Sequence, residues 1–108
     1  MTMYAVLYTY SDDVAGRDEH RPAHREFLGD LASDGTLLMS GPFPRTETAG
    51  ALLVLDATSS DEVRELLRED PLQQQGLVEA VDVREWTPVR GAWMPHVEAL
   101  SWKGTSVD

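Results

Sequence analysis

Two side chains of the sequence, His24 and Asp70, have the chemistry needed for proton transfer. A histidine ring is the commonest general acid or base in proteins, and a neighbouring carboxylate can fix its orientation and its tautomer. His24 lies on the apolar stripe of a predicted helix, which points its ring inward at the core. Asp70 precedes Pro71, and a residue before proline is pushed out of the helical region. A carboxylate at such a turn can be aimed at a partner, so the two residues are a candidate catalytic dyad.

Both residues also have purely structural interpretations. A histidine on an apolar stripe can be a core residue, and an aspartate before proline is a frequent N-cap of a short helical turn, here residues 70–76. Pro22 suits the first turn of a helix and would place His24 close to the helix start. The macrodipole there disfavours the imidazolium and leaves the ring able to accept a proton. Spacing alone leaves both interpretations open.

A second group of residues could hold a substrate. Arg21 could bind an anionic or phenolate group at the mouth of the site, although a solvated arginine is the alternative. Ser40 and Gly41 end a predicted strand beside Pro42, where a hydroxyl and a free amide could bind a ligand oxygen. An ordinary strand-ending turn explains these three residues equally well.

The sequence predicts no metal ion and no cofactor. There is no cysteine, and no glycine-rich loop of the kind that binds nucleotide phosphates. His20 and His24 have the spacing of a zinc pair on a helix, but Pro22 is expected to leave His20 outside the helix.

Charge and composition exclude several partners. Nineteen acidic residues against nine basic ones give a formal charge of −10, which repels nucleic acids and anionic lipid surfaces. No apolar run approaches the roughly 20 residues of a membrane-spanning helix. The N-terminal residues lack the basic region of a secretory signal, so we expect a cytoplasmic protein.

The order of predicted elements is βαββαβ, the pattern of an α+β domain. It predicts a four-stranded antiparallel sheet with both helices on one face. Ser59 and Glu62 have the spacing of a capping box at the start of the second helix, and Gly35 is typical of a helix end. Strands are expected over residues 4–10, 36–40, 51–56 and 78–86, with helices over 22–33 and 60–69.

The predicted sheet is apolar on both faces, because residues 4–8 and 52–55 are apolar at odd and even positions alike. Something must cover the face opposite the helices, and we expect a homodimer through that face. Alternatively, the extension over residues 89–108, beyond the domain of residues 1–88, folds back over its own sheet. Trp93 and Trp102 in this extension are expected to be buried against the body or the partner, or to close over the site as a lid.

Four short motifs over about residues 3–87 resemble the YCII-related family. They are Arg21-Pro22-Ala23-His24, then Gly35, then Ser40-Gly41-Pro42, and finally Asp70-Pro71 with Gly76. The resemblance implies a ferredoxin-like subunit that dimerises through its sheet into an α/β barrel, with an active site around His24 and Asp70. The best-understood activity of this family is the dehydrochlorination of a chlorinated hydroxyquinol. Related barrels include muconolactone isomerases and small monooxygenases.

These observations lead to two functional hypotheses. In the first, the chain is a cofactor-independent lyase or isomerase that acts on a small cyclic or aromatic hydroxylated compound, with His24 oriented by Asp70 as the proton-transfer group. Ser40 and the Gly41 amide would steady the developing oxyanion, and Arg21 would hold the substrate. In the second, the chain is a non-catalytic small-molecule-binding or accessory protein.

Overall fold

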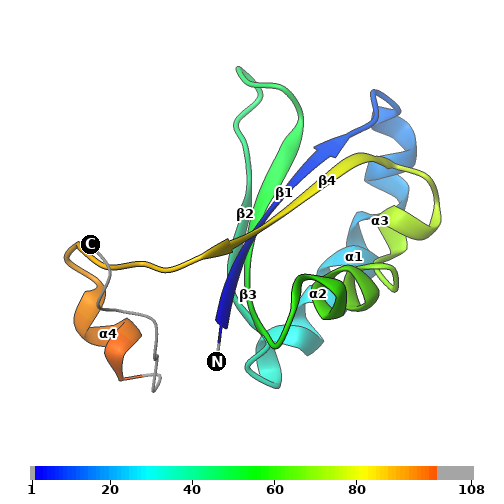
Figure 1. The fold of residues 1–108 in the computed structure, drawn as a ribbon. Helices are drawn as coiled ribbons and strands as arrows, with labels where there is room; N and C mark the ends of the chain where they lie inside the picture. Colours follow the sequence, from blue (N-terminus) through cyan, green and yellow to red (C-terminus); the bar gives the residue numbers. More distant parts are fainter. Residues whose placement is uncertain (1, 100–108) are drawn as a thin grey trace.

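Four antiparallel strands form one sheet, with helices on one of its faces (Figure 1). The computed structural model describes residues 2–99. Its elements are β1 (Thr2–Tyr10), α1 (Val14–Ser33), β2 (Leu37–Pro42), β3 (Gly50–Ala57), α2 (Ser60–Leu67), α3 (Pro71–Gln74), β4 (Val78–Trp86) and α4 (Met94–Glu98). The strand order is β2-β3-β1-β4, and β1 pairs with β3 on one side and β4 on the other. This arrangement confirms the predicted ferredoxin-like α+β fold.

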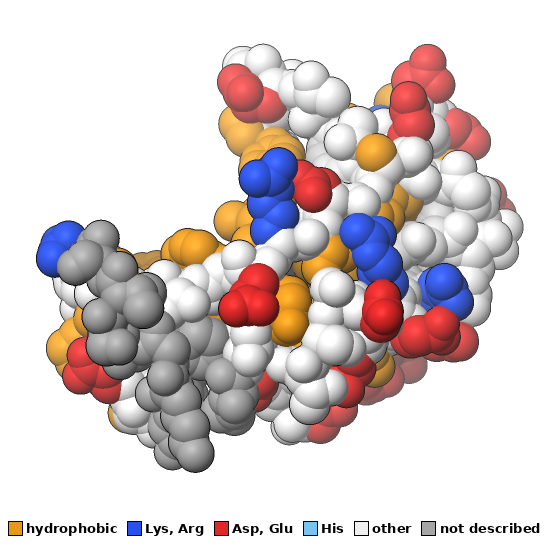
Figure 2. Space-filling model, viewed as in Figure 1, with side chains coloured by type: hydrophobic (Ala, Val, Ile, Leu, Met, Phe, Trp, Pro, Cys, Tyr) orange, Lys and Arg blue, Asp and Glu red, His pale blue; other side chains and the backbone are white. Residues whose placement is uncertain are grey.

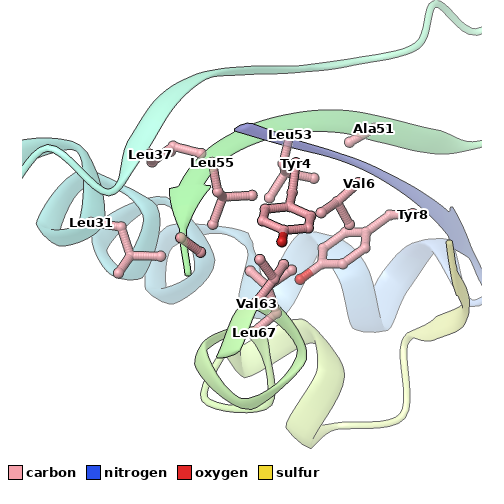
Figure 3. Packing of buried hydrophobic residues seen from close by; sticks show 11 residues of the cluster. Tyr4, Val6, Tyr8, Leu31, Leu37, Ala51, Leu53, Leu55, Val63 and Leu67 are labelled. Carbon is pink, nitrogen blue, oxygen red and sulfur yellow. The ribbon is translucent and has the colours of Figure 1, made fainter. Parts of the chain in front are cut away.

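The core lies between the sheet and helices α1 and α2 (Figure 3). Alternate residues of β1 point to this side, among them Val6 and Tyr8, and Leu53 and Leu55 do the same on β3. Val63 and Leu67, one turn apart on α2, meet them from the helix side. The five other members of the buried cluster are Tyr4, Leu31, Leu37, Ala51 and Ala57, and the partly buried Phe27 packs against the cluster. The sheet and helices therefore bury one continuous apolar layer.

Local signals set several helix ends as predicted. The Ser59 side chain accepts a hydrogen bond from the Glu62 amide at 3.1 Å, and Glu62 reaches back toward the Thr58 amide at 3.4 Å. At the end of α1 the chain turns through Gly35 with φ of 85°, a conformation that costs glycine nothing. The capping signals read from the sequence are confirmed at both positions.

The start of α1 differs from the prediction. The helix begins at Val14, before the predicted start at residue 22, and Pro22 lies in its interior. The N-cap is Asp13, whose carboxylate accepts from the Gly16 amide at 2.9 Å. His24 is therefore in the middle of α1, and the macrodipole argument does not apply because that effect fades beyond the first turn. Although α1 has 20 residues, neither it nor another helix within residues 2–99 is apolar enough to cross a bilayer.

The second strand also runs further than predicted. β2 includes Gly41 and Pro42, which pair with Leu52 and Ala51 of β3. The expectation that proline would break the strand at Gly41 was wrong because β2 is an edge strand. A proline on an edge strand can turn its missing donor away from the sheet.

The face of the sheet opposite the helices carries a patch of apolar side chains, with the charged residues Asp56, Asp82 and Arg84 on the same face. Its exposed large apolar side chains come from all four strands. They are Leu7, which is 38% exposed, Leu52 at 39%, Trp86 at 46% and Met39 at 51%. In contrast, Met3 and Val54 on the same face are buried. This face is the one that the sequence predicted to need a cover.

The segment after β4 leads away from the sheet and ends in the short helix α4 (Figure 1). Apolar side chains occupy a hollow between this segment and the sheet (Figure 2). Trp93, at the start of α4, is 67% exposed in the single chain. Trp102 lies outside the described residues. The packing of the extension against the body or a partner stays a prediction.

Candidate active site

His24 and Asp70 are in direct contact although 46 residues separate them. His24 Nδ1 lies 2.8 Å from Asp70 Oδ1 and 3.0 Å from Oδ2. The histidine comes from the middle of α1 and the aspartate from the turn before α3. His24 is 8% exposed and Asp70 is fully buried. The fold thus brings together the two residues that the sequence proposed as a dyad.

Asp70 is held in place by two further donors. The Tyr8 hydroxyl donates to Oδ2 at 2.9 Å, and the Leu72 amide donates to Oδ1 at 3.0 Å. The second bond is the N-cap of α3, so the structural interpretation of Asp70 also holds. Cap and dyad are compatible because a carboxylate can accept several hydrogen bonds. The cap fixes the carboxylate in the direction of His24.

The contacts of Asp70 define the tautomer of His24. A carboxylate only accepts, so the His24 nitrogen that faces it, Nδ1, must carry a hydrogen and donate. The opposite nitrogen, Nε2, has no hydrogen-bond partner within residues 2–99. The His24 side chain is 11% exposed, whereas that of Asp70 is fully buried. In the neutral ring Nε2 therefore carries no hydrogen and is available to accept a hydrogen bond or a proton.

A cavity of about 720 Å³ lies beside this ring, between α1 and the hairpin formed by β2 and β3. Its wall contains His24 and all four residues that the sequence proposed for substrate binding, which are Arg21, Ser40, Gly41 and Pro42. Asp70 is behind His24 and does not line the cavity. Arg21 is half-exposed and forms an ion pair with Asp18 at 2.6 Å. The cavity therefore offers Nε2, a hydroxyl and cationic side chains to a small molecule.

Two tyrosines next to the dyad are held in their protonated form. Burial, followed by the charge of Asp70, raises the pKa of the Tyr8 hydroxyl well above its usual value. Burial and the same carboxylate raise the pKa of Tyr10, and the nearby cations Arg17 and Arg21 oppose that rise. Tyr8 consequently remains a hydrogen-bond donor to Asp70 at neutral pH.

The sequence does not predict two residues of the site. Tyr8 was expected only as an apolar strand residue, and Arg17 lay outside the predicted helix. Tyr8 had one detectable signal, since a tyrosine at a core-facing position of a strand brings a hydroxyl that must find a partner. Arg17 is on α1 and contacts the cavity, which no pattern in its own segment indicated.

The structure also revises the view of His20. Because α1 begins at Val14, His20 is helical and lies one turn before His24. The expectation that Pro22 would keep His20 outside the helix was wrong. Over residues 2–99, however, no three His, Asp or Glu side chains gather closely enough to hold a metal ion.

Replacing Tyr8 with phenylalanine is expected to lower the free energy of unfolding at pH 7 by about 1.5–3 kcal/mol, the range for a hydrogen bond to a charged group. The folded pKa of Tyr8 exceeds its unfolded value, so this stabilisation is complete below about pH 10 and is lost as the pH rises above it. The difference between the wild type and Tyr8→Phe should therefore shrink above about pH 10. Urea unfolding at pH 7 and in alkaline buffer measures both effects. Tyr10→Phe is the control at pH 7, since no hydrogen bond of its hydroxyl is seen within residues 2–99; a larger loss for Tyr10→Phe would contradict the prediction.

Comparison with protein-family models shows which family the chain belongs to. A model of the YCII-related domain matches residues 2–87. The chain belongs to the YCII-related family. The YCII-related segment extends from β1 to the end of β4 and contains both dyad residues, whereas α4 follows it.

Two curated relatives resemble this YCII-related chain along most of their length. The protein YjpA of Bacillus subtilis, which is named as uncharacterised, is 33% identical over 84 residues, covering 78% of this chain and 95% of the relative. The derivative of benzaldehyde biosynthesis cluster protein C of Emericella nidulans is 34% identical over 77 residues, covering 63% of this chain and 79% of the relative.

Solved structures share the fold of the YCII-related chain. One is the 5-chloro-2-hydroxyhydroquinone dehydrochlorinase TftG of Burkholderia phenoliruptrix, in complex with 2,5-dihydroxybenzoquinone. It aligns with a TM-score of 0.62 at 24% identity, covering 78% of this chain and 93% of that one. An antibiotic biosynthesis monooxygenase aligns with a TM-score of 0.54 at 9% identity, covering 83% of this chain and 100% of that one. At these identities the likeness establishes the fold.

Proposed function

We propose that the chain is a cofactor-independent lyase or isomerase that acts on a small hydroxylated ring compound. The observation that carries this proposal is the position of His24, with Nδ1 bound to buried Asp70 and the ring at the wall of a cavity. A histidine fixed on one nitrogen and free on the other is the arrangement of a general base. Asp70 orients the ring and stabilises the imidazolium that forms when Nε2 takes a proton.

The reaction begins with transfer of a hydroxyl proton of the ring compound to His24 Nε2. The electron pair of that oxygen moves into the ring, and a ring carbon takes up a proton. In an isomerase the sequence ends with this exchange of hydrogen positions. In a lyase a leaving group such as chloride then departs with its bonding electrons, and a second hydroxyl proton is lost. Net loss of HCl balances atoms and electrons without an added oxidant.

The residues around the cavity fit a ligand of this class. The volume of about 720 Å³ is in the range of typical small-molecule sites, about 300–1,000 Å³. The Ser40 hydroxyl, in the part of the cavity wall that also contains Gly41 and Pro42, can donate to an oxyanion on the ring, whereas the Gly41 backbone pairs with Leu52 in the sheet. Arg21 lines the same space, and although it is paired with Asp18, its guanidinium has further N–H groups that can donate to a ligand oxygen.

The names of two similar proteins support the class of substrate. TftG is a dehydrochlorinase of a chlorinated hydroxyhydroquinone, and its structure contains a dihydroxybenzoquinone. The relative from Emericella nidulans is named for a cluster that makes a derivative of benzaldehyde. Both names describe oxygenated six-membered rings, which is the class that we propose for this chain.

The test is an exchange assay that needs no knowledge of the natural substrate. The protein is incubated in D₂O with 1,2,4-trihydroxybenzene and, separately, with its 5-chloro derivative, and ring hydrogens and free chloride are followed by NMR and ion chromatography. We expect deuterium incorporation or chloride release faster than in buffer. Saturable binding without acceleration would instead support a non-catalytic binding module, and neither binding nor acceleration would contradict both hypotheses.

We also propose that two copies of the chain associate through the sheet face opposite the helices. Leu7, Leu52, Met39 and Trp86 give this face one exposed apolar side chain from each strand, and each is more than a third exposed in the single chain. Apolar patches of this kind are usually covered by another protein surface. We expect the covering surface to be a second copy of the chain, because in a twofold dimer the same patch of each copy packs against that of the other.

Changing Leu7 to glutamate is expected to convert the dimer into a monomer, because each copy would then bury a carboxylate in the contact between the two sheets. The matched control is Ala23→Glu, which adds the same charge on an exposed position of α1. Light scattering coupled to size exclusion gives the mass of each form. The proposal predicts twice 12.0 kDa for the wild type and the control, and 12.0 kDa for Leu7→Glu; a monomeric wild type would refute it.

A further inference from the structure

The cavity beside His24 collects positive charge in a strongly acidic chain. The chain has a formal charge of −10 with only nine Lys and Arg residues, yet four of these nine line the cavity. They are Arg17, Arg21, Arg25 and Arg45. Arg21 is neutralised by its ion pair with Asp18, whereas no carboxylate of residues 2–99 forms an ion pair with the other three. Two carboxylate residues, Asp18 and Glu47, also line the cavity, so its cations outnumber its anions and it favours an anionic ligand.

Among these cations Arg17 has the most restricted side chain. Its guanidinium lies over the ring of Tyr10, with Cζ 5.5 Å from the ring centroid. Its Nε is buried and has no hydrogen-bond partner within residues 2–99. A buried N–H of an arginine without an acceptor costs free energy, and such groups in folded proteins usually have a partner that the protein alone does not supply. A ligand oxygen in the cavity would satisfy it.

Arg17 and His24 are both residues of α1, so the helix sets the distance between them. Arg17 and His24 are about two helical turns apart, so both side chains project from the same face of α1, roughly 10 Å from each other along the axis. Both line the same cavity. A single substituted ring with an anionic group at one end and the reacting hydroxyl at the other can span side chains placed in this way.

We propose that Arg17 is the anion-binding residue of this cavity, and that its ligand is a ring compound whose carboxylate or phenolate oxygen accepts from the Arg17 guanidinium. The assignment of the opposite end of the ring to His24 rests on the proposed function; the anion subsite itself does not. Tyr10 acts as the platform that keeps the guanidinium flat against the cavity wall, since stacking restricts an arginine that has no carboxylate partner.

The test compares two ligands that differ only in charge, 2,5-dihydroxybenzoate and its methyl ester. Calorimetric titration gives the Kd of each for the wild type, for Arg17→Gln and for Arg64→Gln. Arg64 is an exposed arginine of α2 and serves as the matched control. We expect the wild type and the control to prefer the acid by about tenfold or more, and Arg17→Gln to lose that preference while binding the ester as before.

Two additional variants make each outcome decisive. Arg17→Met retains the aliphatic stem and replaces Arg17→Gln if the latter does not fold; it should also lose the preference for the acid. His24→Gln should keep the preference, because the subsite does not depend on proton transfer. Equal binding of acid and ester by the wild type, or an unchanged preference in both Arg17 variants, would overturn the proposal. An Arg17-dependent preference without any turnover would refute the proposed reaction and leave the anion subsite standing.

Discussion

A His24→Gln variant is expected to lose about 10²- to 10⁴-fold of the exchange rate or chloride-release rate of the wild type, the usual contribution of a general base. Glutamine has about the size of histidine and can still donate a hydrogen bond from its amide to Asp70. It cannot take up a proton at the position of Nε2. The substitution therefore removes the base without leaving the buried carboxylate unpaired, and the fold and ligand binding should be kept.

The control for this variant is His20→Gln, one helical turn earlier on the same helix. His20 is not among the residues that line the cavity, and its nearest carboxylate, on Glu19, is 3.9 Å away at the surface. It should therefore retain the full rate. A His24→Gln variant as fast as the wild type would exclude His24 as the base, whatever the rate of the control.

The largest effect on stability is expected from Asp70→Ala, which should lower the free energy of unfolding by about 3–5 kcal/mol. Asp70 is fully buried and accepts from three partners, the Tyr8 hydroxyl, the His24 ring and the Leu72 amide. Alanine leaves all three donors without their acceptor in a buried site. Because small domains have only about 5–15 kcal/mol of stability, a large part of it would be lost.

Urea unfolding followed by circular dichroism measures this effect, with Asp30→Ala as the control. Asp30 is an exposed aspartate of α1, and its replacement should change the stability by less than about 0.5 kcal/mol. Asp70→Asn should fall between the two variants, since its amide oxygen can still cap α3 but its amide nitrogen cannot accept from Tyr8. Equal stability of Asp70→Ala and the wild type would mean that the hydrogen bonds around Asp70 contribute little.

The fold was predictable because its signals are local and agree with one another. Apolar alternation marked the strands, and Ser59 with Glu62 marked the start of α2. The start of α1 was not predictable by the same means, because its first two turns carry mainly polar side chains and show no apolar stripe. Pro22 was the stronger signal there and gave the wrong boundary, although Asp13 was a usable N-cap.

The residues of the candidate site could be predicted only where they belong to a recognisable sequence motif. His24 and Asp70 are in separate elements, and no periodicity indicates that a residue of α1 contacts the turn before α3. The resemblance to a family indicated that pairing, and the distance of 2.8 Å between His24 Nδ1 and Asp70 Oδ1 shows that the two side chains are in hydrogen-bond contact. Tyr8 and Arg17 belong to no motif; their roles depend on which side chains the folded chain places beside them.

The most direct test of the account is a ¹⁵N NMR measurement of both ring nitrogens of His24, before and after addition of 2,5-dihydroxybenzoquinone. The structure predicts that Nδ1 carries the hydrogen and Nε2 is the free nitrogen. Addition of the ligand should shift the Nε2 resonance strongly and leave Nδ1 bound to Asp70. A hydrogen on Nε2 with a bare Nδ1, or two resonances that the ligand does not move, would contradict the assignment of His24 as the proton-transfer group.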